Sequence, residues 1–240
     1  MIAVLLPGMD GTGTLFDPFA GELPRHVQAV RVSYPASVHL NYDQLADRVR
    51  GELPSGQPYI VVAESFSGPV ALRLADRPVG NLRAIVLVAS FVSRPLGLLG
   101  SPIARLPLAS VFRARPPRWI LRWLLMEPAT PPEMVSAVQV AIGRVSPGVL
   151  AARMREALAV DCTAAALACP VRIVCLVSER DRLLGRRTAR ALRRLSQRIE
   201  VVTVQAPHLL LQCAPRAGIA AMNRLGLLDE TGAIAQGALN

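Results

Sequence analysis

The sequence contains apolar runs, rich in β-branched residues, in which no polar residue alternates with the apolar ones. Residues 59–63 read YIVVA, and residues 2–6, 84–89 and 171–177 have the same character. A strand without a polar side must be covered on both faces, which is typical of parallel sheets flanked by helices. These runs therefore predict strands in the interior of a parallel sheet.

Strands and helices are expected to alternate along most of the chain. Two further strands are expected at residues 27–32 and 199–204, and helices at 41–53, 69–77, 186–195 and 215–225. Strand-helix alternation of this kind favours right-handed crossovers that place helices on both faces of one sheet. The sequence predicts an α/β fold with a mostly parallel sheet of about six strands.

The alternation stops between residues 94 and 160. This segment holds nine prolines, helical patterns at 119–126 and 148–158, and no convincing strand. We therefore expect residues 1–93 and 161–228 to form the α/β core, residues 94–160 to form an inserted helical cap, and residues 229–240 to form a loose C-terminal tail.

Charge and cysteine content exclude some classes of protein. The formal charge of +10 comes from 27 basic residues, all of them Arg, but no aromatic stacking platform or nucleic-acid-binding motif accompanies them. The cysteines have no metal-binding spacing, so buried reduced thiols and no metal are expected; they are Cys162, Cys169, Cys175 and Cys213. Nucleic acid is not an expected partner.

No apolar run is long enough for a membrane-spanning helix. The first apolar residues, 2–6, form too short a run for a signal sequence and follow no basic leader. These features predict a cytoplasmic protein without a transmembrane segment.

A serine lies where a buried strand is expected to turn into a helix. Such a sharp turn can present a serine as a nucleophile, provided that the residues two before and two after it are small. Ala63 and Ser67 meet this condition around Ser65. If Ser67 were the nucleophile, Pro69 would stand two residues after it, where proline fits the first turn of the helix better. Ser65 is therefore the candidate nucleophile.

Three histidines are candidates for the base that such a serine needs. His26 lies at the start of the second expected strand, and His39 lies in the loop that follows this strand. His208 comes after the last expected strand, at the edge where parallel sheets meet their ligands. His208 is the candidate base, and a surface histidine is the alternative.

The acid that orients the base is expected at the same edge. Asp181 follows the penultimate expected strand, and Glu179 is a rival two residues earlier. An ion pair with a neighbouring arginine is the alternative role for Asp181. Ser65, Asp181 and His208 each follow a different strand, so a parallel sheet can bring them together.

Two backbone N–H groups are expected to stabilise an oxyanion near Ser65. Phe66 directly follows the serine, and the glycine-rich loop after the first strand can bring the N–H of Met9 to the same place. The residues DGT at 10–12 are similar to a phosphatase motif whose nucleophilic aspartate stands two residues earlier, but Gly8 occupies that position here. The glycine spacing is similar to that of a P-loop, but the phosphate-binding lysine is missing. Phosphate chemistry is therefore not expected.

On these residues the chain resembles the α/β-hydrolase superfamily over about residues 2–226. The motifs LPGMDGTG at 6–13 and AESFSG at 63–68 are similar to those of small bacterial hydrolases and of hydrolase-type acyltransferases such as plant phytyl ester synthases. The order Ser, Asp, His is also that of the superfamily. The resemblance implies an α/β-hydrolase fold that lacks the first two strands, with residues 94–160 as the cap over the active site.

The resemblance also implies roles for single residues. They are Ser65 as nucleophile, His208 as base, Asp181 as acid, and Met9 and Phe66 as oxyanion donors. The chain departs from common patterns of the superfamily at Pro7, Ala63, Ser67 and Ser178. These departures bear on the subfamily rather than on the triad.

A basic and aromatic helix is expected within the cap. Trp119 and Trp123 are four residues apart, and so are Arg118 and Arg122, which gives an apolar face and a basic edge. The apolar face could line an acyl pocket while the arginines hold an anionic acyl carrier or a lipid head group. The alternative is a helix packed on the core with solvated arginines.

Together these features predict a serine hydrolase that cleaves carboxylic esters or thioesters of a medium or long acyl chain through an acyl-enzyme, without a cofactor. An acyltransferase that uses the same triad is one alternative. The other is a catalytically silent protein of this fold that binds a ligand or a partner. The oligomeric state is left open.

Overall fold

The computed structural model of the protein describes residues 1–77, 79–97, 100–195 and 197–229. Its strands are β1 (Ile2–Leu6), β2 (Gln28–Arg31), β3 (Tyr59–Glu64), β4 (Leu82–Val88), β5 (Arg172–Ser178) and β6 (Ile199–Val204). They form one sheet in the order β2-β1-β3-β4-β5-β6, and every neighbouring pair is parallel. The predicted α/β fold with a parallel sheet of about six strands is confirmed.

The strand order reverses its direction at β1. The chain passes from β1 to β2 on one side and then returns to β3 on the other side of β1. The loops that follow β1 and β3 therefore diverge, and a crevice for ligands forms at such a switch point. These two loops carry Met9 and Ser65.

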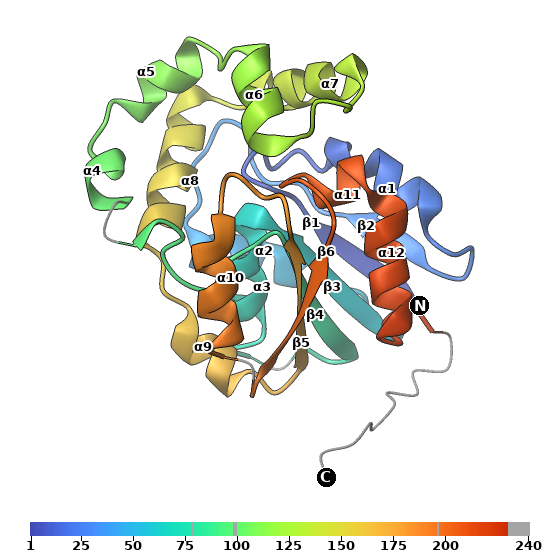
Figure 1. The fold of residues 1–240 in the computed structure, drawn as a ribbon. Helices are drawn as coiled ribbons and strands as arrows, with labels where there is room; N and C mark the ends of the chain where they lie inside the picture. The colour runs from blue at the N-terminus through green and yellow to red at the C-terminus, as the bar shows by residue number, and fades with distance from the viewer. Residues whose placement is uncertain (78, 98–99, 196, 230–240) are drawn as a thin grey trace.

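Helices cover both faces of the sheet (Figure 1). One face packs against α1 (Asp17–Glu22), α11 (Leu210–Cys213) and α12 (Pro215–Arg224). The other packs against α2 (Tyr42–Arg50), α3 (Gly68–Leu74), α9 (Thr163–Ala168) and α10 (Gly185–Arg193). Short 3₁₀ helices, η1 (Thr14–Phe16) and η2 (Ser65–Ser67), follow the β1 and β3 ends. Because both faces are covered, the central residues of the interior strands are apolar without alternation, as at 60–63 in β3 and 84–88 in β4.

Helix α2 shows how the local sequence fixes an element. The Asn41 side chain accepts a hydrogen bond from the N–H of Gln44, and the Gln44 side chain accepts one from the N–H of Asn41. This capping box starts the helix, and Leu45 and Val49 then fall on the buried side that packs on the sheet.

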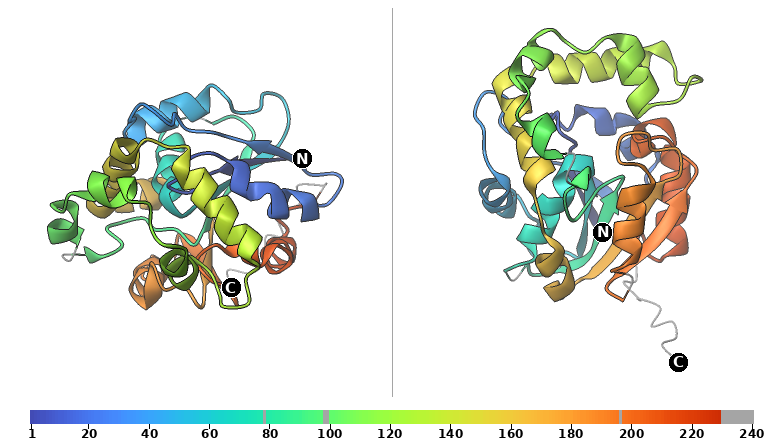
Figure 2. Two further views of the ribbon diagram at one scale, coloured as in Figure 1. Left: turned by 90° about the horizontal axis from the view of Figure 1, so that it is seen from above. Right: turned by 60° about the vertical axis from the view of Figure 1, so that its left-hand side comes forward.

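The inserted segment, residues 94–160, lies between β4 and β5. Its helices are α4 (Gly100–Ala104), α5 (Leu108–Arg113), α6 (Arg118–Leu125), α7 (Pro132–Gly143) and α8 (Pro147–Ala159). The views in Figures 1 and 2 show these helices as an arch at one end of the sheet. An isolated antiparallel bridge between Ser93 and Asp161 joins the two ends of the segment.

The expected strands and helices are all present and differ from the observed ones mainly at their boundaries. The observed strands start or end within two residues of the expected ones. The sequence patterns do not predict six further helices that the described residues form: α1, α4, α5, α7, α9 and α11. Five of these are short, and the apolar residues of α7 show no clear helical face. Most of the expected C-terminal tail, residues 230–240, lies outside the described residues.

The four cysteines are free thiols, as expected; Cys162, Cys169 and Cys175 are buried, and Cys213 is partly exposed. Among the described residues, no single helix has the length and apolar composition needed to cross a membrane. Helices α7 and α8 satisfy that test only as a pair, with a bend of 99° between them.

Candidate active site

The candidate nucleophile Ser65 occupies a strained turn. Strand β3 ends at Glu64, and Ser65 begins η2 with a φ of 48°, a left-handed conformation that is uncommon for a residue other than glycine. The Ser90 hydroxyl donates a hydrogen bond of 2.6 Å to the Ser65 carbonyl. A Cβ atom at Gly68 would collide with that hydroxyl, so the close approach of Ser90 requires glycine there.

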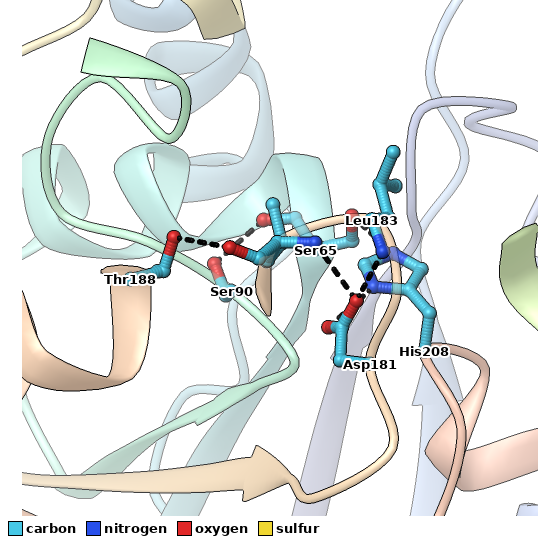
Figure 3. A network of polar contacts seen from close by, with 7 residues as sticks. Ser65, Ser90, Asp181, Leu183, Thr188 and His208 are labelled. Atoms are coloured by element: carbon cyan, nitrogen blue, oxygen red, sulfur yellow. Dashed lines mark hydrogen bonds and ion pairs between the residues drawn. The ribbon is translucent and has the colours of Figure 1, made fainter. Parts of the chain in front are cut away.

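Ser65, His208 and Asp181 form one chain of hydrogen bonds (Figure 3). The Nε2 atom of His208 lies 3.0 Å from Oγ of Ser65, and its Nδ1 atom lies 2.8 Å from Oδ2 of Asp181. The His208 and Asp181 side chains are only 3% and 6% exposed. The structure thus brings together the three residues that the sequence analysis selected from different strand ends.

The Asp181 carboxylate is held in its ionised form. Burial alone would raise its pKa, but the hydrogen bond and charge of His208 and the N–H groups of Leu184 and Leu183 lower the pKa below its ordinary value. Both N–H groups donate to Oδ1 at 2.8 Å, which leaves Oδ2 for His208. Glu179, the rival from the sequence, is exposed and outside this chain of hydrogen bonds.

The loop after β1 lies beside the serine. Met9 and Phe66 line the same cavity as Ser65. The N–H of Phe66 lies in the first turn of η2, where it has no acceptor within the helix. The Met9 N–H donates to no other residue that the structure describes. Both groups are therefore available to stabilise negative charge on a substrate oxygen.

Arg153 of α8 holds this loop from the inserted segment. Arg153 is only 1% exposed. Its guanidinium donates hydrogen bonds of 2.8–3.0 Å to the carbonyls of Met9, Asp10 and Pro35. A Cβ atom at Gly11 would lie 2.5 Å from its Nη1 atom, so only glycine leaves room for the guanidinium. The sequence analysis missed Arg153, since nothing local distinguishes it from the other arginines.

Ser67 links the loop after β1 to the serine turn. Its hydroxyl donates a hydrogen bond to the Pro7 carbonyl and lies 2.6 Å from the Tyr34 hydroxyl. Ser67 and Tyr34 are both buried. The serine that replaces a common glycine of the motif thus connects three segments of the site. Tyr34 is a second residue that no local pattern distinguishes, and the sequence analysis missed it.

Glu64, directly before the nucleophile, is a buried acid. Its side chain is 3% exposed; Oε2 accepts a hydrogen bond from Gln212, and Oε1 has no partner among the described residues. Burial raises its pKa to about 7, and the influence of Asp10 adds to this, although Gln212 and His208 act in the opposite direction.

An apolar cavity of about 190 Å³ opens beside Ser65. Its walls come from both the core and the inserted segment: Met9, Phe66, Phe91, Leu183 and Leu184 on one side, and Pro95, Leu96, Ile103, Met154, Ala157 and Leu158 on the other. The cavity therefore suits an apolar group attached to a carbonyl carbon at Ser65.

The aromatic and basic helix α6 is placed differently from the expectation. Trp119 and Trp123 are 70% and 58% exposed, and neither lines the cavity beside Ser65. Arg118 donates to the Pro132 carbonyl and Ser136 hydroxyl, and Arg122 donates to two carbonyls of the connection between α6 and α7. The indoles are exposed because Leu121, on the opposite side of α6, is the residue that packs inward.

The carboxyl end of α6 contacts the loops that carry Asp181 and His208. Arg182 donates to the Trp123 carbonyl at 2.8 Å, and its guanidinium lies 5.5 Å from the centre of the Trp123 ring. The N–H of Leu209 donates to the Leu125 carbonyl at 3.0 Å. Trp123 therefore helps to join the inserted segment to the loop that carries Asp181, called the acid loop.

Metal binding finds no support in the part of the chain that is described, where no group of three or more His, Cys, Asp or Glu side chains could hold an ion.

Residues 3–221 match the model of the alpha/beta hydrolase family. A search of curated protein sequences finds no significant match. Among solved structures, an esterase from Thermogutta terrifontis superposes with a TM-score of 0.77 at 19% identity, covering 93% of this chain and 88% of that one. An enol-lactonase from Burkholderia xenovorans superposes with a TM-score of 0.72 at 15% identity, covering 95% and 90%.

A third similar structure is an esterase from Rhodococcus, with a TM-score of 0.70 at 16% identity and coverage of 93% and 89%. At these identities the structures show a shared fold. The family match and the fold confirm the superfamily resemblance stated from the sequence.

Proposed function

The chain belongs to the alpha/beta hydrolase family, and we propose that it is a serine hydrolase that cleaves carboxylic esters or thioesters of an acyl substrate through an acyl-enzyme. One observation carries the proposal: a hydrogen-bonded chain from Ser65 through His208 to Asp181 meets an apolar cavity at the serine. The esterases among the structures of the same fold support it.

In the first half of the reaction, Oγ of Ser65 attacks the carbonyl carbon of the substrate while Nε2 of His208 accepts its proton. The carboxylate of Asp181 stabilises the resulting imidazolium. Negative charge moves to the carbonyl oxygen, where the N–H groups of Met9 and Phe66 receive it. Such donors typically contribute about 3 kcal/mol each to the stability of the transition state.

Collapse of this intermediate breaks the bond to the leaving group, and His208 returns the proton to the departing alcohol or thiol. The acyl group stays on Ser65. Water then attacks the acyl carbon, His208 accepts its proton, and the same two N–H groups stabilise the second oxyanion. Release of the carboxylic acid restores the serine.

The lining and the volume of the cavity indicate which acyl groups the proposed substrate carries. It is apolar and carries no charged side chain among its described lining residues, so it favours an uncharged acyl group. Its volume of about 190 Å³ is below the roughly 300–1,000 Å³ of common ligand pockets, which favours a short or medium acyl chain over the long one also considered from the sequence.

Labelling with a fluorophosphonate probe tests the nucleophile, since the probe reacts with a serine that a neighbouring base activates. We expect one adduct on Ser65 and none in Ser65→Ala or His208→Ala. A series of esters and thioesters of increasing acyl length then gives the substrate preference. A folded protein without an adduct on Ser65, and without turnover of any member of the series, would instead support the silent binding protein.

Asp181 and Glu179 provide a matched pair of acids. Asp181→Asn is expected to lower kcat by at least about a thousandfold, because the amide no longer favours the productive tautomer of His208. Glu179→Gln, two residues away and exposed, is expected to leave kcat unchanged. Equal losses in the two variants would contradict the assignment of the acid.

Acyl transfer to an alcohol is the second candidate, because apolar cavity walls limit the access of water to the acyl-enzyme. Product analysis with added alcohol separates the two reactions. Free acid as the main product supports the hydrolase, whereas an ester of the added alcohol as the main product identifies a transferase.

A further inference from the structure

The outer side of the inserted segment exposes an unusual share of large apolar side chains. Seven such side chains are exposed among the described residues, and five of them belong to this segment: Leu106, Val111, Trp119, Trp123 and Val140. Helices α5, α6 and α7, which carry four of the five, lie at the outer end of the molecule (Figures 1 and 2). The exposed apolar surface is therefore concentrated at one end.

The same segment is strongly basic. Residues 94–160 contain nine arginines and three glutamates. Of the glutamates, Glu127 forms an ion pair of 2.6 Å with Arg180, outside the segment. The remaining two glutamates are too few to neutralise the arginines of the segment.

A groove of about 510 Å³ brings the two features together between α6 and α7. Arg115, Arg118 and Arg144 line it together with the exposed Val140, and its described lining holds no acidic side chain. Arg118 is engaged by the Pro132 carbonyl and Ser136. The exposed guanidinium groups of Arg115 and Arg144 make no hydrogen bond or ion pair to other described residues, so both can receive an anion.

We propose that this outer surface docks on a lipid bilayer that contains anionic phospholipids. The groove takes a phosphate head group through Arg115 and Arg144, and Trp119 and Val140 enter the boundary between head groups and acyl chains. Arginine and tryptophan side by side are typical of surfaces that lie in this boundary, where an indole contacts hydrocarbon while its N–H keeps a polar partner.

An acidic carrier protein would match the charge equally well, but the apolar side chains favour the bilayer. They are spread over α5, α6 and α7, and the groove that Val140 lines has basic walls. A protein partner needs a compact apolar centre with a polar rim, whereas a bilayer accepts scattered apolar groups that each enter to a shallow depth.

The chain carries its own reporter for this proposal, since Trp119 and Trp123 are its only two tryptophans. We expect the full-length protein to sediment with vesicles of phosphatidylcholine containing 30% phosphatidylglycerol, and its tryptophan emission to shift to shorter wavelength. Binding should weaken at high salt and be much weaker on pure phosphatidylcholine. Absence of binding to the anionic vesicles at low salt would overturn the proposal.

Two pairs of substitutions distinguish the contribution of the groove to vesicle binding from that of the overall positive charge. Arg115→Gln with Arg144→Gln should weaken vesicle binding about 25-fold, because each arginine contributes about fivefold to binding at an anionic surface. Arg190→Gln with Arg194→Gln removes the same charge from exposed positions at and after α10 and should change binding less than threefold. Equal losses in both pairs would mean that charge alone drives binding and would contradict the groove.

Trp119→Ser tests the apolar part. It should reduce both vesicle binding and the emission shift, with Trp123 as the remaining reporter. Unchanged hydrolysis of a soluble ester by the Arg115→Gln, Arg144→Gln variant shows that the fold is intact. Binding of an acidic carrier protein through Arg115 and Arg144, without an emission shift on vesicles, would identify the protein partner and refute the bilayer.

Discussion

The inner and outer sides of the inserted segment use arginine in opposite ways. On the inner side, Arg153 is 1% exposed and donates to three backbone carbonyls beside the candidate nucleophile. On the outer side, Arg115 and Arg144 are exposed and line a groove without a partner among the described residues. Burial, rather than residue type, separates an arginine that supports the site from arginines that are available to a ligand.

This difference teaches how the insertion contributes to the core. Helix α8 supplies both Arg153, which fixes the Met9 loop, and Met154, which lines the cavity. The loop that carries the proposed oxyanion donor Met9 and one wall of the cavity therefore depend on the same helix of the segment, while α5–α7 present a surface to the surroundings. Substitutions on the two sides should have different effects on stability and on activity.

The largest effect is expected at Arg153. Arg153→Met leaves three partly buried carbonyls without their donor, which should lower the free energy of unfolding by on the order of 3 kcal/mol and also lower kcat, because the Met9 loop loses its support. Arg155→Met, on the exposed side of the same helix, should change stability by about 0.5 kcal/mol or less. Urea unfolding measures the stability of the two variants, and ester kinetics measure their kcat. Equal losses in Arg153→Met and Arg155→Met would contradict the distinction between the inner and outer sides.

A second large effect concerns the buried acid beside Ser65. Glu64 releases its proton near pH 7 in the folded protein and near 4.5 when unfolded, so the folded state holds more protons between these values. Stability should therefore fall as pH rises through this window, by about 3 kcal/mol in total.

Glu64→Gln removes this titration. The variant should match the wild type at pH 4 and be more stable at pH 8 by about 3 kcal/mol, whereas Glu179→Gln, an exposed substitution, should follow the wild type at both. Urea unfolding at the two pH values provides the test. A Glu64→Gln variant that is less stable at pH 8 would show that the ionised carboxylate supports the fold.

A smaller effect is expected where α6 meets the acid loop. Arg182→Ala loses the hydrogen bond to the Trp123 carbonyl and the contact with its ring, at an exposed position, so thermal unfolding should show a loss of about 1 kcal/mol. Arg182→Lys keeps the charge and should lose less. If Arg182→Ala lowered the free energy of unfolding as much as Arg153→Met does, the contact with Trp123 would support the fold as strongly as the buried contacts of Arg153.

The smallest effect is expected in the groove itself. Arg115→Gln with Arg144→Gln should change the free energy of unfolding by less than about 0.5 kcal/mol, since neither guanidinium bonds to another described residue. Thermal unfolding measured beside the vesicle assay checks this. A clear loss of stability would show that these arginines support the segment, and the contrast with Arg153 would disappear.

Much of the core could be predicted because its signals are local. Strand β3 is recognisable from its apolar run, and the sharp turn after it requires small residues around Ser65. Asp181 and His208 follow β5 and β6, and the carboxyl ends of parallel strands meet at one edge. Strand periodicity and this single topological rule were sufficient to bring the three residues together.

The contacts of the inserted segment could not be predicted in the same way. Trp119 and Trp123 were expected at an acyl pocket, but the cavity is lined instead by residues such as Phe91, Met154 and Leu183. An amphipathic pattern shows that a helix has two sides, yet not which side another helix covers. That choice depends on packing between helices distant in sequence.

The sequence by itself determined the α/β class, the parallel sheet and the order of Ser65, Asp181 and His208, because strand periodicity and turn chemistry act over a few residues. Only the tertiary structure decided that Arg153 reaches the Met9 carbonyl, 144 residues away, and that Ser67 joins Tyr34 to the first loop. Burial and long-range hydrogen bonds select one arginine among 27 identical side chains, and no local pattern carries that information.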